Sequence, residues 1–96
     1  MYELRFHPKV DKELEAIPKE LRIEIRDVHF VAISSEPRKE GEPLKGTLRG
    51  YWKRSLRWRG VEYRISYEID EKDKAVYVLM VRKREGFYPL LERRVR

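Results

Sequence analysis

The chain has 96 residues, of which 41% are hydrophobic and 42% charged, and its net charge is +6. This length provides one modest core, so it predicts a single domain spanning residues 1–96 and excludes a multidomain protein. Charged residues interrupt every apolar run, so we predict neither a signal peptide nor the roughly 20 apolar residues of a membrane span, and expect a soluble cytoplasmic protein.

The first half of the chain is predicted to form one strand and a helical hairpin. Apolar and polar residues alternate from residue 2 to residue 7, which is typical of a strand with one buried face. Pro8 suits the first turn of a helix, and apolar residues follow at helical spacing until Pro18. A second helix begins there and continues to about Ser34. Several proline and glycine residues between 35 and 50 predict a loop.

The second half is predicted to form three strands and a final helix. Residues 51–56 indicate a strand, and 57–60 a turn. Residues 61–69 give the clearest signal, because apolar and polar residues alternate throughout. Residues 75–81 are apolar on both faces, so we expect a strand that is central or covered twice. Pro89 can start the last helix. The order βααβββα predicts a small α+β domain in which an antiparallel sheet carries the helices, including the N-terminal hairpin, on one face.

Cysteine, asparagine and glutamine are missing from the sequence. Without cysteine there are no disulfides, thiolate nucleophiles or zinc fingers. The missing amides, together with abundant Lys, Arg and Glu, are typical of a heat-adapted protein, so we predict a thermophilic source. Because side-chain amides are the usual readers of adenine edges, a nucleic acid bound here would be read with little sequence specificity.

The basic residues are concentrated in two segments. Residues 49–67 and 82–96 together hold 12 basic and 3 acidic side chains, whereas the rest of the chain holds 11 basic and 14 acidic ones. Such segregation favours a polyanionic partner. The alternative is an ordinary solvated surface of mixed charge. It explains the rest of the chain well but explains the two basic segments poorly.

Several kinds of catalytic chemistry lack the residues they need. His7 and His29 are the only histidines and are too few for a three-ligand zinc site, so we expect packing or capping roles for both. No glycine-rich nucleotide-binding motif occurs, and no cofactor is expected. Glu62 and Glu68 share a strand face with Arg64, where ion pairs are expected instead of a glycosidase pair.

Strand parity predicts that cations converge on the sheet face turned away from the helices. If the apolar residues of 61–67 pack on the helices, Arg64 points the other way. A partner strand with Trp52 and Leu56 buried then sends Lys53, Ser55 and Arg57 to the side of Arg64. Arg54 falls on the core face, unless it lies at the sheet margin. The run Arg82, Lys83 and Arg84 leaves the last strand and can curl back over this face, with Tyr88 close behind.

Such a patch can bind RNA phosphates, with Arg54, Arg57, Arg82 and Lys83 as candidate contacts. Cleavage without metal needs a base for the 2′-hydroxyl, cations for the phosphorane, and a proton for the departing 5′-oxygen. A lysine can be the base when neighbouring cations lower its pKa, and arginine acts as a clamp. The candidate catalytic residues are Lys53, Arg64, Arg84 and Tyr88. The alternative is that these residues only bind RNA or solubilise the protein.

Four motifs carry a resemblance to a known family: the opening YELRFHPKV, the segment PLKGTLRGYWKRSL, the signature GVEYRISYEID followed by AVYVLMV, and the tail RKREGFY. Over nearly its whole length the chain resembles the RelE/ParE toxin superfamily of type II toxin–antitoxin modules. The resemblance implies a fold like that of small microbial ribonucleases and a metal-independent endoribonuclease that cuts mRNA in the ribosomal A site. It leaves a 2′,3′-cyclic phosphate and a 5′-hydroxyl. The implied partners are the ribosome, mRNA and a RelB-like antitoxin in a hetero-oligomeric complex.

The resemblance also implies roles for single residues. The motif WKRSL aligns with Y-K-x-K-L of the family, which places Lys53 on its first catalytic lysine. Arg64 falls on the phosphate-binding arginine, Arg84 on the arginine after the last strand, and Tyr88, after a short gap, on the C-terminal tyrosine. Ser55 stands where many members have a second lysine, which implies weakened activity or another substrate.

Two other functions remain open on the sequence. ParE-type members of the superfamily share this scaffold and are thought to inhibit DNA gyrase. A basic RNA-binding module without catalysis is the second alternative.

Overall fold

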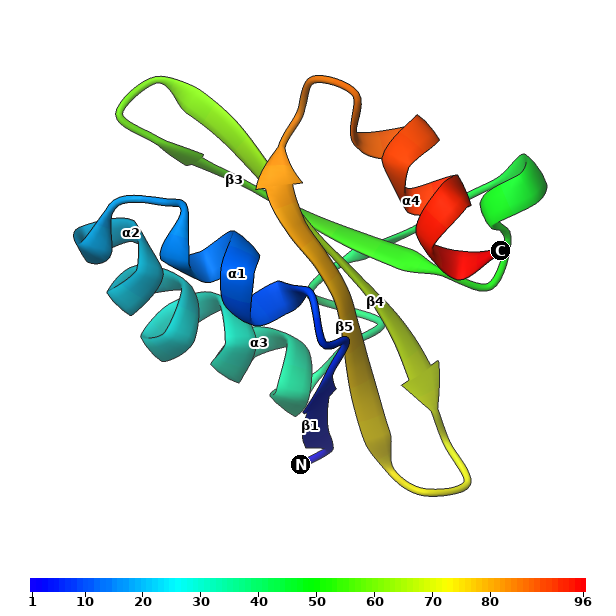
Figure 1. Ribbon diagram of the computed structural model, residues 1–96. Coiled ribbons are helices and arrows are strands. Elements are labelled where there is room, and N and C mark those ends of the chain that lie inside the picture. Colours follow the sequence, from blue (N-terminus) through cyan, green and yellow to red (C-terminus); the bar gives the residue numbers. More distant parts are fainter.

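A five-stranded sheet with the order β1–β5–β4–β3–β2 organises the computed structural model, which describes all residues 1–96 (Figure 1). The strands are β1 (Glu3–Phe6), β2 (Glu42–Pro43), β3 (Trp52–Trp58), β4 (Val61–Asp70) and β5 (Ala75–Lys83). The helices are α1 (Val10–Glu15), α2 (Lys19–Glu24), α3 (Phe30–Ser35) and α4 (Phe87–Val95). The α+β class and the N-terminal helices predicted from the sequence are confirmed. No helix combines the length and apolar composition needed to cross a bilayer.

The sheet is mixed, so the prediction of a wholly antiparallel sheet was wrong. The ladders between β3, β4 and β5 are antiparallel, but β1 runs parallel to β5, with Glu3 opposite Ala75. Alternation in residues 2–7 shows which side chains are buried and contains no information about strand direction. The two-residue strand β2, which pairs with Trp52 and Lys53, is too short to leave a pattern in the sequence.

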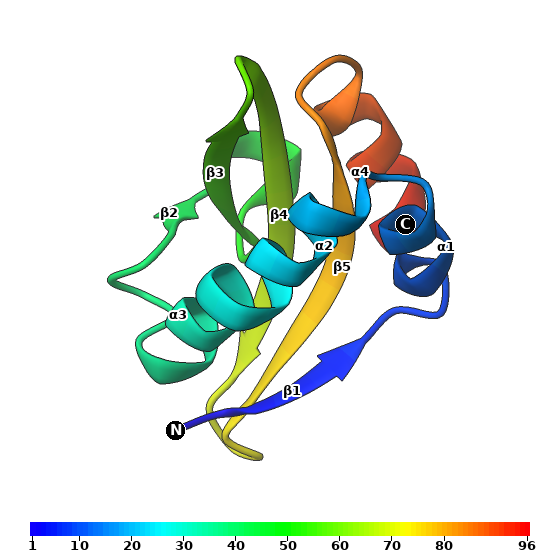
Figure 2. The same cartoon turned by 90° about the vertical axis from the view of Figure 1, so that its left-hand side faces the viewer.

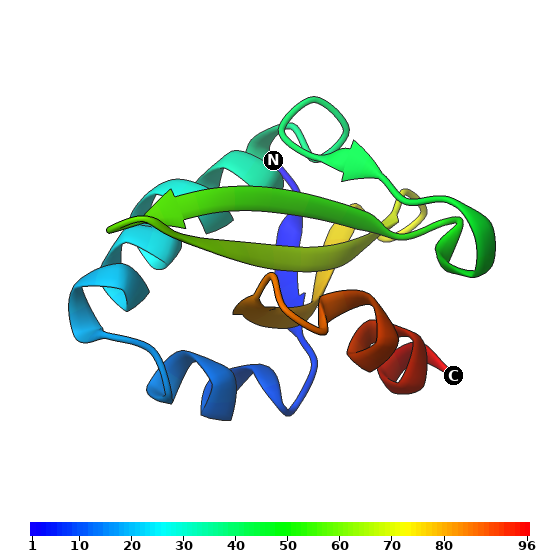
Figure 3. The ribbon, with the colours of Figure 1, turned by 90° about the horizontal axis from the view of Figure 1, so that it is seen from above.

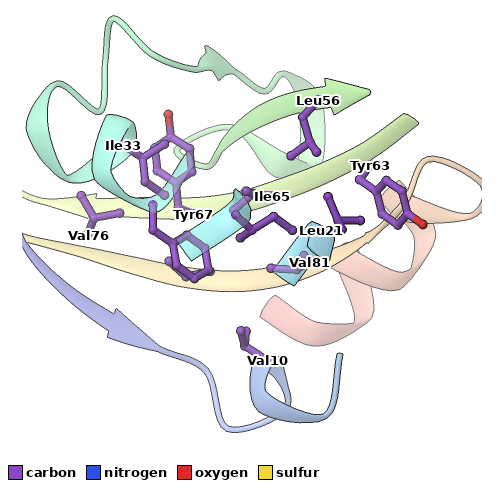
Figure 4. Close-up of a cluster of buried hydrophobic side chains, with 12 residues drawn as sticks. Val10, Leu21, Ile33, Leu56, Tyr63, Ile65, Tyr67, Val76 and Val81 are labelled. Carbon is purple, nitrogen blue, oxygen red and sulfur yellow. The ribbon is translucent and has the colours of Figure 1, made fainter. Parts of the chain in front are cut away.

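Helices cover both faces of the sheet, whereas the sequence predicted helices on one. Figure 2 shows α2 and α3 in front of β3, β4 and β5, and in Figure 3 α4 lies on the other side of β3 and β4 from α3. The larger buried cluster lies under α1 to α3 (Figure 4) and contains Val10, Leu21, Ile25, Phe30, Ile33, Leu56, Tyr63, Ile65, Tyr67, Val76, Val78 and Val81. The smaller one lies under α4 and contains Leu44, Leu48, Leu79, Met80, Phe87 and Leu91. Burial on both faces explains the continuous apolar sequence of β5.

A β-bulge lets β5 serve both clusters. Ser66 of β4 pairs with Met80 and Tyr67 pairs with Val78, which leaves Leu79 without a partner. Both Leu79 and Met80 therefore reach the cluster under α4, while Val78 stays on the opposite face.

A buried ion pair closes the part of the β5 edge that β1 does not cover. Pairing with β1 ends at Val78. Beyond it, the backbone N–H of Val81 donates to Glu13 Oε1 (3.0 Å), and Arg94 donates to the carbonyl of Leu79 (2.9 Å). The carboxylate and guanidinium also meet each other, with Oε2 3.0 Å from the same arginine nitrogen. Side chains from α1 and α4 thus take the place of a neighbouring strand.

Gly41 is required by the close approach of Tyr67, whose hydroxyl donates to the carbonyl of Pro37 (2.6 Å). Burial raises the pKa of this hydroxyl to about 12. A Cβ at Gly41 would lie 1.8 Å from the tyrosine oxygen and 2.9 Å from the carbonyl of Lys53. Gly41→Ala is therefore expected to lower the free energy of unfolding by about 1–3 kcal/mol, measured by urea denaturation.

The double variant Gly41→Ala/Tyr67→Phe tests this cause, because it removes the atom nearest to the added methyl group. We expect the double variant to lose less free energy of unfolding than the sum of the losses measured for Gly41→Ala and Tyr67→Phe alone. A Gly41→Ala protein with wild-type stability would show that the loop moves freely away from Tyr67.

Candidate functional site

Two cations and a phenol ring meet on the sheet face that carries α4. Lys53 of β3 places its Nζ 6.0 Å from the centroid of the Tyr88 ring, and Arg64 of β4 places its Cζ 5.1 Å from the same centroid. Tyr88 belongs to the first turn of α4. The register explains the meeting, because Lys53 pairs with Ser66 and Ser55 with Arg64, so the two cations are diagonal neighbours on one face.

This cluster is partly screened from solvent and borders a hollow. The exposed fractions of the Lys53 and Arg64 side chains are 17% and 11%. A cavity of about 450 Å³ is lined by Lys53 and Tyr88 together with the loop after β2 and two carboxylates, Glu42 and Glu92. Lys53 Nζ lies 4.0 Å from Glu42 Oε1, a weak pair because that carboxylate is 70% exposed.

Arg84 lies at the rim of the same face, just after β5. Its backbone N–H donates to the carbonyl of Glu62 (3.1 Å), and its own carbonyl accepts from the N–H of Phe87 (3.2 Å). The turn into α4 needs Gly86, which has a φ of 69°. The exposed side chain of Arg84 thus stands beside Glu62.

Glu62 forms the ion pair predicted with Arg64. The Nε of Arg64 donates to Glu62 Oε2 at 3.0 Å, and Arg57 lies 4.0 Å from the other oxygen. The hydrogen bond from Arg64, reinforced by the charges of Arg64, Arg84 and Arg57, holds the pKa of this carboxyl below its usual range. Glu68, the other candidate for such a pair, forms no salt bridge, and its side chain stays exposed.

Arg54 lies on the opposite face, under the N-terminal helices. Its Nε donates to His29 Nδ1 (3.0 Å), and its Nη1 donates to the carbonyl and carboxylate of Glu40 (2.8 and 3.1 Å). On its other side, His29 Nε2 meets Glu24 at 3.1 Å. The sequence placed Arg54 both on the core face and among the phosphate contacts. The structure shows the first location and separates Arg54 from the cluster around Tyr88.

A π-helical turn, Ile25–His29, makes this arrangement possible. Two residues five apart on an α-helix, such as Glu24 and His29, point about 140° away from each other. The wider turn brings them to one side, so the imidazole lies between Glu24 and Arg54. His29 is buried, as predicted, and has a packing role.

The remaining basic candidates flank the cluster without joining it. Arg57 donates to the carbonyl of Gly60 (3.2 Å) at the end of the hairpin. Arg82 pairs in register with Arg64, but its Nη1 lies 3.7 Å from Glu13 Oε2. Lys83 pairs with the buried Tyr63 and lines a cavity of about 460 Å³ on the side of α1.

His7 makes a local hydrogen bond before α1 but does not cap this helix, whose N-cap is Lys9. The Nδ1 of His7 accepts from the backbone N–H of Lys9 (3.1 Å) just before α1. Burial, reinforced by the charge of Arg94, lowers the pKa of His7.

The residues around Tyr88 suit the binding of a phosphodiester. Arg64 and Lys53 supply positive charge, and the terminal nitrogens of Arg64 form no hydrogen bond within the protein. The phenol supplies an aromatic surface and a hydroxyl donor. Ser55, opposite Arg64 in the register, leaves the place of a second lysine without a charge.

Comparison with known proteins gives a consistent match. Residues 4–92 match the family described as "ParE-like toxin of type II bacterial toxin-antitoxin system". Toxin RelG of Mycobacterium tuberculosis is 32% identical over 87 residues, which cover 91% of this chain and 95% of that protein.

Two solved structures have the same fold. The toxin–antitoxin complex RelBE2 of Mycobacterium tuberculosis contains a chain that is 30% identical, with a TM-score of 0.74, over 86% of this chain and 98% of that one. The intact RelBE toxin–antitoxin complex of E. coli contains one that is 28% identical, with a TM-score of 0.74, over 88% and 99%.

Proposed function

Because this chain belongs to the ParE-like toxins of type II bacterial toxin–antitoxin systems, we propose that it is a metal-independent endoribonuclease that cuts mRNA on the ribosome, in the cytoplasm. The observation that supports this proposal most is the meeting of Lys53, Arg64 and Tyr88 on one sheet face, with Arg84 at its rim. These residues come from three elements and match the types that transesterification of RNA requires.

The proposed reaction is an attack by the 2′-hydroxyl oxygen on the adjacent phosphorus. Lys53 accepts the 2′-hydroxyl proton as the new O2′–P bond forms. The bond from phosphorus to O5′ then breaks, and the Tyr88 hydroxyl donates a proton to O5′. Arg64 clamps the non-bridging oxygens with its free terminal nitrogens, and Arg84 adds charge at the rim. The products are a 2′,3′-cyclic phosphate and a 5′-hydroxyl.

Ser55 is expected to make this reaction slow away from the ribosome. The residue lies directly opposite Arg64 and brings no charge to the phosphate. The ribosome, by fixing the mRNA in a reactive geometry, supplies the orientation that the protein alone provides weakly.

The proposed partner that silences the toxin is a RelB-like antitoxin. Both solved complexes cited above pair a toxin of this fold with an antitoxin. An acidic segment of such a partner would complement the basic residues around Tyr88 and form a hetero-oligomeric complex.

Toeprinting on translating ribosomes tests the proposal, at moderate and at elevated temperature because the composition predicts a thermophilic source. We expect cuts at codon-defined positions that end in a cyclic phosphate. Intact mRNA combined with inhibited DNA supercoiling would favour gyrase inhibition instead. Salt-dependent RNA binding without cuts or growth arrest would reduce the protein to an RNA-binding module.

A further inference from the structure

Glu62, the second residue of β4, lies among arginines on the sheet face that carries α4. It is the only acidic residue between positions 49 and 67, a segment that holds six Lys and Arg residues. Its side chain is 24% exposed and contacts Arg64 and Arg57, while its backbone carbonyl accepts from Arg84. The Glu62 side chain thus contacts two arginines, one from β3 and one from β4, and its backbone is bonded to the backbone of a third, Arg84, just after β5.

The contact with Arg64 fixes how that side chain can meet a phosphate. The Nε of Arg64 donates a hydrogen bond to Glu62, and this is the only hydrogen bond that the Arg64 side chain forms. The Tyr88 ring lies against the guanidinium. With the Nε and one face of the plane occupied, the guanidinium has little freedom to rotate. Its two terminal nitrogens remain available, and these form the edge that binds phosphate in a fork.

We propose that Glu62 is a positioning residue that orients Arg64, with Arg57 and Arg84 beside it, toward the scissile phosphate. This inference rests on the proposed ribonuclease function. Glu62 has two effects of opposite sign, because its charge weakens the general attraction of the face for RNA while its hydrogen bond prepares Arg64 for the transition state. Removing it should separate binding from catalysis.

Three variants test this separation. Glu62→Ala is expected to slow single-turnover mRNA cleavage about 10- to 100-fold. The dissociation constant for a short oligoribonucleotide should fall about two- to fivefold at low salt. Glu62→Gln keeps an oxygen that can accept from Nε and should retain more of the cleavage rate than Glu62→Ala. Glu68→Gln removes the same charge on the same strand face, about 20 Å away, and is expected to keep the wild-type rate.

An NMR measurement reports on the contact without any cleavage. The ¹H–¹⁵N signal of Arg64 Nε should be protected from solvent exchange in wild type and Glu68→Gln and lose this protection in Glu62→Ala. If wild-type protein leaves mRNA intact, the ribonuclease proposal fails, and the NMR and RNA-binding measurements still decide the role of Glu62.

Four outcomes would overturn the inference. If Glu62→Ala cuts mRNA as fast as wild type, or faster, the Glu62 carboxylate does not help catalysis and only competes with the phosphate for Arg64. Weaker RNA binding by this variant would contradict the claim that the charge of Glu62 weakens the attraction of this face for RNA. Equal effects of Glu62→Ala and Glu68→Gln would reduce the role to net charge, and an Arg64 signal that stays protected in Glu62→Ala would rule out the positioning contact.

Discussion

Lys53→Ala is expected to lower ribosome-dependent mRNA cleavage by about 10²- to 10⁴-fold, because it removes the proposed base for the 2′-hydroxyl. Arg64 and Arg84 stay protonated at any physiological pH and cannot substitute. Expression of the variant should no longer arrest growth. The measurements are toeprinting for the cleavage rate and culture density for the arrest.

Antitoxin binding and stability should change little in the same variant. Lys53 is partly exposed, and its one ion pair, with Glu42, is weak. Lys19→Ala is the control, because that lysine is exposed, forms no ion pair and lies in α2, which packs on the sheet face opposite to Tyr88. Full cleavage by Lys53→Ala would remove this residue from the proposed mechanism.

Arg94→Ala is expected to lower the free energy of unfolding by about 3–5 kcal/mol, the largest loss of stability for any change of one charged side chain in this protein. The variant removes the nearer of the two cations that face the carboxylate of Glu13, which is 8% exposed, and leaves only Arg82 at 3.7 Å. It also leaves the carbonyl of Leu79 without the Arg94 donor. Urea denaturation followed by circular dichroism measures the loss.

Arg93→Ala is the matched control for this prediction. The residue is adjacent in α4, exposed and without an ion pair, so its loss should change stability by no more than about 0.5 kcal/mol. Replacing Glu13 and Arg94 together by leucine should recover part of the stability, since no charge is then left buried alone. Equal stabilities of Arg94→Ala and Arg93→Ala would contradict the prediction and show that Arg82 or water satisfies Glu13.

The sequence was most informative where alternation is regular. The two-residue period of β4 predicts the direction of Arg64, and the parity of Lys53 with Trp52 and Leu56 places both cations on one face. The same parity put Arg54 on the core face, where the structure has it.

Features that depend on contacts between distant segments left no such signal. The direction of β1, the position of α4 on the second face and the bulge at Leu79 arise from how the elements pack, and a one-dimensional pattern contains none of these. The link from Glu62 to Arg57 and Arg84 was missed for a similar reason, although an isolated acid within a basic segment was a visible sign. Only the pair with Arg64, two residues away on the same strand face, followed from spacing.

The π-helical turn has a consequence for how relatives of this chain diverge. A turn closed over five residues instead of four is equivalent to the insertion of one amino acid. A homologue that lacks this extra residue between Ile25 and His29 would have a regular α-helix there, and its imidazole would no longer reach β3. Helix length and the residue at position 54 should therefore covary in evolution: arginine where the insertion is kept, and an apolar side chain where it has been deleted.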